Sequence, residues 1–286
     1  MKKQVFVVIV NFNGGEKTLA SIESVKKYSV VVVDNRSRKS SLDALKAQGS
    51  RLKNLILIEN KENLGFAGGA NVGIKKALKE GAEYVMLLNQ DAIIKSNAVE
   101  KLVNIMGKDK RIGICGPLIL APNKKIWSAG GVVDKKRYSA GHLFKILNKN
   151  PYQVDFVSGC CMMIKKEVFE KIGFFDERFF LYYEDVDLCI RAQKAGFKVV
   201  LVPKTVVYHQ VQDGGEVRQY FMARNHLLFL EKHGPLKIKA REMVRLPKTI
   251  YEHLNRGETY ALLGVRDYFF AGKLRLLRGL QPGRTL

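Results

Sequence analysis

Residues 5–34 read VFVVIVNFNGGEKTLASIESVKKYSVVVVD, and this stretch decides the fold. Two predicted strands, at 5–10 and 30–34, flank a helical pattern near 16–27; the first is apolar throughout and the second is four valines followed by Asp34. Apolar runs without polar alternation indicate strands that are buried on both faces, as in parallel sheets covered by helices. The alternation continues with a helix, a strand, a helix and a strand near 41–48, 54–58, 67–80 and 84–88. We therefore predict an α/β fold with a Rossmann-like, mostly parallel sheet and helices on both faces.

Polar loops follow three of these strands at the point where each strand ends. They are Asn11 to Gly15, Asp34 to Ser37 and Asn89 to Asp91. Ligands of such sheets bind beyond the carboxyl ends of the strands, so we expect the three loops to meet in one crevice. The first loop reads NFNGG, which lacks the G-x-G-x-x-G fingerprint of dinucleotide-binding proteins. Gly68 and Gly73 have P-loop spacing, but Ile74 stands where the P-loop lysine is needed.

The chain is strongly basic, with 49 Lys and Arg against 27 Asp and Glu and a net charge of +22. The excess is spread along the whole chain and implies polyanionic partners. No RNP, zinc-finger or helix-turn-helix signal accompanies it, so we do not expect nucleic acid among them. No apolar run approaches the roughly 18 residues of a spanning helix. The four cysteines show no C-x-x-C spacing, which argues against a zinc site or a disulfide framework and fits the cytoplasm.

Five segments resemble, in order, the signature series of the family-2 glycosyltransferases. They read VVIVNFNG, VVVDNRS, NLGFAGGANVGI, LNQDA and YYEDVDLCIR, and the resemblance covers roughly residues 4–233. Within the family, the segments are similar to those of rhamnosyltransferases. The resemblance implies the GT-A fold. It also implies a catalytic domain at 1–233, with a donor half at about 1–110 and an acceptor half at about 111–233. A basic, amphipathic helical tail would follow at 234–286.

The resemblance implies a site for a nucleotide-diphosphate sugar along the crevice. Asp34 matches the carboxylate that binds the pyrimidine base of the donor, although Asp-Asn also caps loops through Asx-turns. The glycines of 63–73 allow close backbone approach to a ligand, or tight packing of a helix on the sheet, which we favour for Gly73. The donor-binding residues implied in this way are Asn11, Asn13, Asp34, Asn63, Gly65, Gly68, Gly69, Asn71, Asn89 and Asp91.

The segment LNQDA occupies the position of the family's D-x-D metal motif. Asn89 replaces the first carboxylate, so a metal would depend on Asp91, diphosphate oxygens and water. His209 matches a histidine that completes the metal site in relatives resembling rhamnosyl- and galactofuranosyltransferases. A lone histidine at a strand end is otherwise more often structural. Mixed oxygen and imidazole ligation suits Mn²⁺ at least as well as Mg²⁺.

By the same resemblance, Asp185 is the catalytic base, and Glu184 positions an acceptor hydroxyl or a loop. The alternative is that acidic residues at a helix start only complement the helix dipole. Asp187 lies four residues before Arg191, which predicts an intrahelical ion pair. The aromatic residues expected to form a stacking floor for an acceptor sugar are Tyr182, Tyr183 and Trp127.

Residues after 233 change in composition, with helical patterns near 236–254 and 258–278. Apolar residues of the second pattern stand beside Lys and Arg, which suggests a helix lying on an anionic membrane surface. The same pattern fits equally well a helix that packs on the core or at a homodimer interface. The segment 127–138 suits a hairpin or flap, and the basic stretch 135–149 is either a solvated loop or a contact for acceptor phosphate. The apolar residues of the second pattern are Phe269, Phe270, Leu274, Leu277 and Leu280.

These expectations together describe an inverting glycosyltransferase with dTDP-rhamnose as its first expected donor. UDP-galactofuranose and other nucleotide sugars stay open, as does the acceptor, a glycan or a polyprenyl-diphosphate-linked sugar. Such an enzyme would work in the cytoplasm or at the inner face of the cell membrane. A sugar-phosphate nucleotidyltransferase is disfavoured because the first loop is not a basic, glycine-rich triphosphate loop. A non-catalytic nucleic-acid-binding module has only the charge in its favour.

Overall fold

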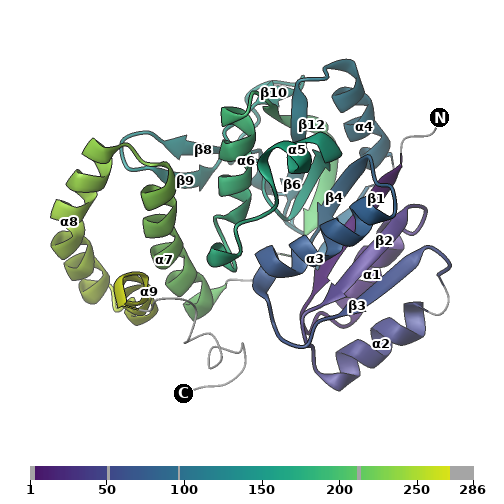
Figure 1. Ribbon diagram of the computed structural model, residues 1–286, viewed down its shortest axis with the longest axis horizontal. Coiled ribbons are helices and arrows are strands. Elements are labelled where there is room, and N and C mark those ends of the chain that lie inside the picture. Colours follow the sequence, from purple (N-terminus) through teal and green to yellow (C-terminus); the bar gives the residue numbers. More distant parts are fainter. Residues whose placement is uncertain (1–3, 50–51, 96, 211–213, 271–286) are drawn as a thin grey trace. The chain divides into compact units, whose positions relative to one another are not determined.

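The first seven elements alternate strand and helix as predicted. The computed structural model describes residues 4–49, 52–95, 97–210 and 214–270. Its first elements are β1 (Val5–Asn11), α1 (Glu16–Ser24), β2 (Ser29–Asp34), α2 (Lys39–Gly49), β3 (Leu55–Glu59), α3 (Gly65–Lys79) and β4 (Tyr84–Leu88). Figure 1 shows β1, β2 and β3 side by side in purple and blue. The apolar runs therefore mark the strands, and the amphipathic segments between them are helices.

The second half of the sheet is more irregular. Its elements are β5 (Ala92–Ile94), α4 (Ala98–Lys108), β6 (Ile112–Leu120), β7 (Ile126–Ser128), β8 (Gly131–Asp134), β9 (Ser139–His142), β10 (Tyr152–Gln153), β11 (Cys161–Lys165), α5 (Lys166–Ile172), α6 (Glu184–Lys194) and β12 (Lys198–His209). The strand order is β10-β12-β6-β11-β4-β1-β2-β3. β11 runs antiparallel to both neighbours, whereas β1 to β4 are parallel to one another and β12 is parallel to β6. The predicted α/β class with a mostly parallel sheet is confirmed.

Helices cover both faces of the sheet. On one face, Val7 and Ile9 of β1 belong to an apolar cluster that includes Ile22 of α1 and Leu102 of α4. On the other face α3 packs directly on β1 and β2, and its Gly73 lies against Val8, where any side chain would overlap. Alternate residues of β1 are therefore buried under different helices, which explains why its sequence is apolar throughout.

The four cysteines are free and lie in the buried interior. Burial raises the pKa of the Cys161 thiol to about 12 and raises the pKa values of the other three as well. A thiol with a raised pKa is neither a nucleophile nor a metal ligand at neutral pH. These residues therefore act as small apolar side chains of the core, namely Cys115, Cys160, Cys161 and Cys189.

The described residues form two compact units. The first holds the sheet with α1 to α6, and the second holds residues 133–141 and 178–183 together with α7 (Gly215–His233), α8 (Leu236–Asn255) and α9 (Thr259–Phe270). β8 and β9 pair as a hairpin, one of the two structures expected for residues 127–138, although it begins later, at Gly131, and Trp127 lies before it on β7. In the part of the chain that the structure describes, no helix combines the length and apolar character needed to cross a bilayer.

The helices expected after residue 233 are present as α8 and α9. One face of α9 packs on α7, where Tyr220 Oη donates to Asp267 Oδ2 at 2.9 Å. Phe270 at the end of α9 is 83% exposed, so packing covers only part of this helix. The remaining apolar residues expected on it lie outside the described residues, namely Leu274, Leu277 and Leu280.

Candidate active site

The polar loops at the carboxyl ends of β1, β2 and β4 meet as predicted. Asn11 Nδ2 donates to Asp34 Oδ2 at 2.6 Å and to Ser37 Oγ at 2.9 Å. The backbone N–H of Phe12 donates to Gln90 Oε1 at 2.8 Å, which ties the loop after β1 to the loop after β4. These bonds join three segments far apart in sequence into one polar crevice rim.

Asp34 is fully buried at this rim, with an exposed fraction of 1%. Its Oδ1 accepts a hydrogen bond from the backbone N–H of Ser37 at 2.9 Å, which is the loop-capping contact that its sequence also allowed. Asn13 has a left-handed backbone with φ of 55°, and its Oδ1 accepts from the N–H of Arg38 at 2.8 Å. Asp34 Oδ1 thus accepts from Ser37 and Oδ2 accepts from Asn11, whereas a carboxylate oxygen can accept two hydrogen bonds.

The start of α3 is anchored to the end of β2 by Asn35, which no sequence motif singled out. The buried Asn35 donates from Nδ2 to the carbonyl oxygen of Gly65 at 2.7 Å. Gly65 has φ of 71°, a conformation that favours glycine, and its N–H donates to Asn63 Oδ1 at 2.9 Å. A Cβ on Gly69 would lie 2.9 Å from Asn35 Nδ2, so this glycine lets the helix approach the sheet.

Two other residues of the same segment contact the scaffold. Asn71 Nδ2 donates to the carbonyl oxygen of Phe175 at 3.0 Å and to Glu177 Oε1 at 2.9 Å, while its Oδ1 accepts from the Phe175 N–H at 3.0 Å. Both ends of this buried amide therefore hold residues 175–177 in place. A Cβ on Gly68 would lie 2.7 Å from the Cβ of Leu64, one turn earlier.

The two expected metal ligands lie beside each other. β12 pairs with β5 so that His209 stands opposite Ala92, next to Asp91. Asp91 Oδ1 is 3.1 Å from His209 Nε2, and the two side chains are 18% and 10% exposed. His209 Nδ1 is buried without a hydrogen-bond partner among the described residues. Asn89 lies two residues before Asp91, and its N–H donates to the carbonyl oxygen of Cys160 at 2.8 Å.

This pair has a geometry that a divalent cation could use. Two ligands on adjacent positions of an octahedral ion, each about 2.1 Å away, lie about 3 Å apart. The 3.1 Å between Asp91 Oδ1 and His209 Nε2 fits that spacing. Within the described ranges, no three His, Cys, Asp or Glu side chains gather around one point. The protein would therefore supply two ligands and leave the remaining positions to substrate oxygens and water.

An aromatic cluster extends from His209. The ring of Trp127 lies 4.8 Å from that of His209 and 4.9 Å from that of His142, between centroids. His142 also packs against Phe156 at 5.3 Å, and its Nδ1 lies 3.0 Å from Ser128 Oγ. His142 was not among the residues singled out from the sequence, because a lone histidine after a hairpin carries no motif.

The two acids that open α6 lie in contrasting surroundings. Asp185 accepts hydrogen bonds at Oδ2 from the Gly159 N–H and at Oδ1 from the Val186 N–H, both at 2.8 Å. Burial raises the pKa of Asp185, and the Gly159 hydrogen bond opposes that rise. Glu184 is 5% exposed, and its Oε2 has no hydrogen-bond partner among the described residues. Burial and the adjacent Asp185 carboxylate raise the pKa of Glu184 well above its usual range.

We expect Glu184→Gln to reduce the pH dependence of stability. The pKa of Glu184 is higher in the folded state than the ordinary 4.5, so its contribution to the free energy of unfolding is complete below pH 4.5. That contribution is lost as the pH rises through the raised pKa. The glutamine amide does not titrate, so urea unfolding at several pH values should show a smaller decline above pH 4.5 than wild type. If the free energy of unfolding changed with pH in the same way for Glu184→Gln and wild type, the pKa of Glu184 would be ordinary.

The third acid of this helix has a structural role. Asp187 is fully buried, and Arg191 Nε donates to its Oδ2 at 2.8 Å, so the predicted ion pair is confirmed. The Arg191 guanidinium also donates to the carbonyl oxygens of Ile172 and Phe174, at 2.8 and 2.7 Å. This network attaches α6 to the end of α5.

Tyr182 and Tyr183, expected to contact an acceptor, belong to a strained loop of the second unit. Phe180, Tyr182 and Tyr183 have φ of 61°, 67° and 71°, which is costly for residues with a side chain. Asn225 of α7 is fully buried. Its Nδ2 donates to three carbonyl oxygens of this loop, those of Phe179 at 2.7 Å and of Leu181 and Tyr182 at 2.8 Å.

We expect Asn225→Ala to destabilise the protein by about 3 kcal/mol, because the two N–H groups of this buried amide serve three carbonyl oxygens, and these lose their donor. Asn225→Asp keeps the shape but turns a carboxylate toward those oxygens, so it should be at least as destabilising. Urea denaturation measures both. If the aspartate variant were as stable as wild type, packing rather than hydrogen bonding would explain the role of Asn225.

Comparisons with known proteins identify the family of this chain. The model of the family described as "Glycosyl transferase family 2" matches residues 6–173, more than half of the chain. The dTDP-rhamnosyl transferase RfbF of Shigella flexneri is 29% identical over 266 residues, covering 85% of this chain and 86% of the relative. The N-acetylglucosaminyl-diphospho-decaprenol L-rhamnosyltransferase of Mycobacterium tuberculosis is 27% identical over 251 residues, covering 77% and 80%.

A solved structure supports the fold independently. The structure described as GalNAc-T7 with UDP, GalNAc and Mn²⁺ superposes with a TM-score of 0.66 over 80% of this chain and 48% of that chain, at 20% identity. This likeness confirms the GT-A fold that the sequence implied. Since the family model matches most of the sheet and the crevice loops, and since the relatives match along most of their length, the chain belongs to glycosyl transferase family 2.

Proposed function

We propose that this enzyme transfers L-rhamnose from dTDP-rhamnose, with inversion, to a hydroxyl of a glycan or polyprenyl-diphosphate-linked acceptor. The observation that supports the proposal is the Asp91–His209 pair beside the polar loops, because these two side chains are close enough to hold one divalent cation together. The choice of rhamnose rests on the two relatives named as rhamnosyltransferases. UDP-galactofuranose is the second candidate donor.

In this proposal the cation is Mn²⁺ or Mg²⁺, held by Asp91 and His209. When bound, it neutralises the charge that develops on the departing nucleoside diphosphate. Asn89 would add at most a neutral amide oxygen, which leaves the ion more positive than in a site with two carboxylates. An imidazole ligand favours Mn²⁺ over Mg²⁺.

The donor site uses the crevice loops. Asn11, Asn13 and Asp34 bind the nucleoside, and the segment from Asn63 through Gly65 to Gly68 faces the diphosphate, with Asn63 capping the Gly65 N–H and the next N–H groups of the first turn of α3 directed at the ligand. Gly69 and Asn71 act through packing, because Gly69 lies against Val10 and Asn35 and the Asn71 amide bonds to Phe175. The chain then divides as proposed from sequence, with the donor half at 1–110, the acceptor half at 111–233 and the tail after it.

Asp185 is the general base that takes the proton from the acceptor hydroxyl. The N–H groups of Gly159 and Val186 fix its orientation, and a raised pKa makes it a stronger base than an ordinary aspartate. Glu184, whose pKa is raised by burial and by the adjacent Asp185 carboxylate, acts as a positioning residue. The aromatic side chains that contact the acceptor sugar are Tyr182, Tyr183 and Trp127.

The test is a transfer assay with a panel of donors, in the presence of Mn²⁺ or Mg²⁺. The acceptor is N-acetylglucosamine linked through diphosphate to a short alkyl chain. We expect dTDP release that depends on the acceptor, with one product whose anomeric configuration by NMR is opposite to that of the donor. Release of UDP from UDP-galactofuranose, without release of dTDP from dTDP-rhamnose, would mean that UDP-galactofuranose is the donor. Diphosphate release from a nucleoside triphosphate would instead indicate a nucleotidyltransferase.

A further inference from the structure

Helix α8 has an unusual environment for a helix of 20 residues, because none of its residues is buried. Leu236 and Val244 are 81% and 83% exposed, and Tyr251 and Leu254 are more than half exposed. An amphipathic helix of a globular protein ordinarily buries its apolar stripe against a core. A large exposed apolar face on a folded protein indicates a surface that binds another protein, a ligand or a membrane.

The apolar residues of α8 are gathered on one side. At about 100° per residue they project onto an arc of about 160°, interrupted only by Lys239. Basic residues follow one border of this arc: Lys237, Arg241 and Lys248 are exposed and Arg245 is half-buried. Arg241 and Arg245 pair with Glu242, and the half-buried Glu252 lies on the same border, so the exposed lysines carry most of its free positive charge. The residues on the arc are Leu236, Ala240, Met243, Val244, Leu246, Pro247, Ile250, Tyr251 and Leu254.

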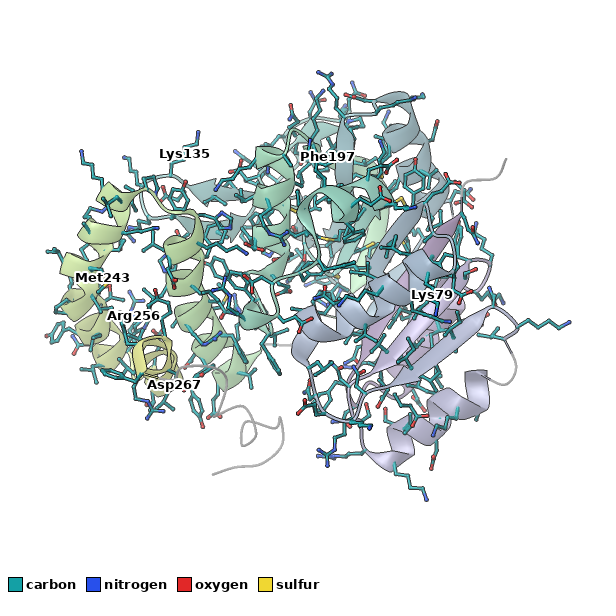
Figure 2. The ribbon with its side chains drawn as sticks, viewed as in Figure 1. Lys79, Lys135, Phe197, Met243, Arg256 and Asp267 are labelled. Atoms are coloured by element: carbon teal, nitrogen blue, oxygen red, sulfur yellow. The ribbon has the colours of Figure 1, made fainter. Side chains whose placement is uncertain are left out.

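Part of this arc faces α9 across an open groove of about 790 Å³. Its α8 wall contains Met243, Leu246 and Ile250, and its α9 wall contains Leu262 and Phe269 among others. Of all its lining residues, only Thr259 and Arg266 are polar. Figure 2 labels Met243 and Arg256 at the α8 side and Asp267 on α9. A groove of this size and composition fits alkyl chains.

We propose that α8 and the α8–α9 groove form a docking surface for a bilayer of anionic phospholipids. The apolar arc would enter the boundary between headgroups and acyl chains, the groove would take up chain ends, and the basic border would contact acidic headgroups. The basic border argues for this partner over a second copy. In a two-fold dimer with antiparallel α8 helices, the basic border of one copy would meet like charge on the other.

This surface differs from the one that the sequence suggested, which placed membrane contact on the last helix. α9 has one face packed on α7, whereas α8 combines a free apolar arc with exposed basic residues. The proposal goes beyond the transfer reaction, since it depends on neither the donor nor the cation.

The test is flotation of the full-length protein with vesicles. One set contains phosphatidylcholine alone, and the other contains about one third phosphatidylglycerol. We expect wild type to float with the anionic vesicles only, and less as salt is raised. Val244→Glu with Tyr251→Glu, and separately Lys237→Glu with Lys248→Glu, should each weaken binding at least about tenfold. The control is Lys53→Glu with Lys79→Glu, which makes the same change of charge at exposed positions of the other unit. It should weaken vesicle binding much less.

Each result has a fixed meaning. Failure of wild type to bind anionic vesicles, or equal weakening by the control pair, overturns the proposal. So does a dimer in light scattering that the Val244/Tyr251 variant dissociates, because a second copy would then occupy the face. All four substituted positions are exposed, and unchanged thermal unfolding verifies folding. The substituted proteins should transfer sugar to a short-chain, water-soluble acceptor at the wild-type rate. Failure of the transfer reaction and failure of membrane docking are therefore distinguishable.

Discussion

Asp185→Asn lowers kcat by about 1,000-fold, within the range of about 10² to 10⁴ that general-base catalysis contributes. The asparagine keeps the side-chain shape and can still accept one hydrogen bond, from Gly159 or Val186. It cannot take a proton from an acceptor hydroxyl. Donor affinity should stay within about twofold of wild type, because the residue contacts no crevice loop in the described hydrogen-bond network. Steady-state kinetics with separate donor and acceptor titrations measure both quantities.

The pH profile of the wild-type enzyme distinguishes a base from a structural carboxylate. Burial raises the pKa of Asp185 above the ordinary 3.8, so the carboxylate becomes protonated at a higher pH than an exposed aspartate would. We expect kcat/KM to fall as the pH is lowered through that raised pKa, and the Asn variant to lack this acidic limb. Retention of near-wild-type turnover by Asp185→Asn would remove it as the base. Val186→Ala, one residue later, is a control for disturbance of α6.

Asp91→Asn reduces Mn²⁺ affinity by more than about 100-fold and lowers transfer in parallel at fixed cation concentration. The substitution replaces an anionic ligand by a neutral amide, which is a much poorer ligand for a hard cation. It retains a group that can hydrogen-bond to His209 Nε2, so the 3.1 Å contact and the packing of Trp127 can persist. Calorimetric titration of Mn²⁺ in the presence of dTDP measures the affinity directly.

Asn89→Asp is the matched variant, because it adds the carboxylate that the ordinary D-x-D motif carries two residues before Asp91. It should raise Mn²⁺ affinity, since a second anionic ligand is added. If Asp91→Asn and wild type bound Mn²⁺ equally, the Asp91–His209 contact would be an ion pair of the scaffold and no cation site.

The sequence predicted the fold because burial dictates it locally. Each central strand lies under helices on both faces, so every position of β2 from Val30 to Val33 has to be apolar, and the pattern is visible without the structure. The same pattern predicted that the loops after β1, β2 and β4 meet, because the carboxyl ends of parallel strands lie at one edge of the sheet. The Asp91–His209 contact was expected only through resemblance to the family.

The remaining site residues depend on contacts that no local pattern records. The Asn71 side chain contacts Phe175, 104 positions away, and Asn225 reaches the loop before α6 across 43 to 46 positions. An asparagine gives no sign in sequence of the carbonyl groups that it will meet. The free face of α8 was also missed, because an amphipathic pattern is the same whether a core or a membrane covers it.

The most direct test of the account is thermal unfolding of the wild-type protein with dTDP, UDP, GDP and CDP, each with and without Mn²⁺. A ligand at a hundred times its Kd adds about 2.7 kcal/mol of stability, which shifts Tm by several degrees for a chain of this size. We predict a shift with dTDP that requires Mn²⁺ and exceeds the shifts with the other three. Absence of a shift with every nucleotide would contradict the central claim that this crevice binds a nucleotide-sugar donor through a divalent cation.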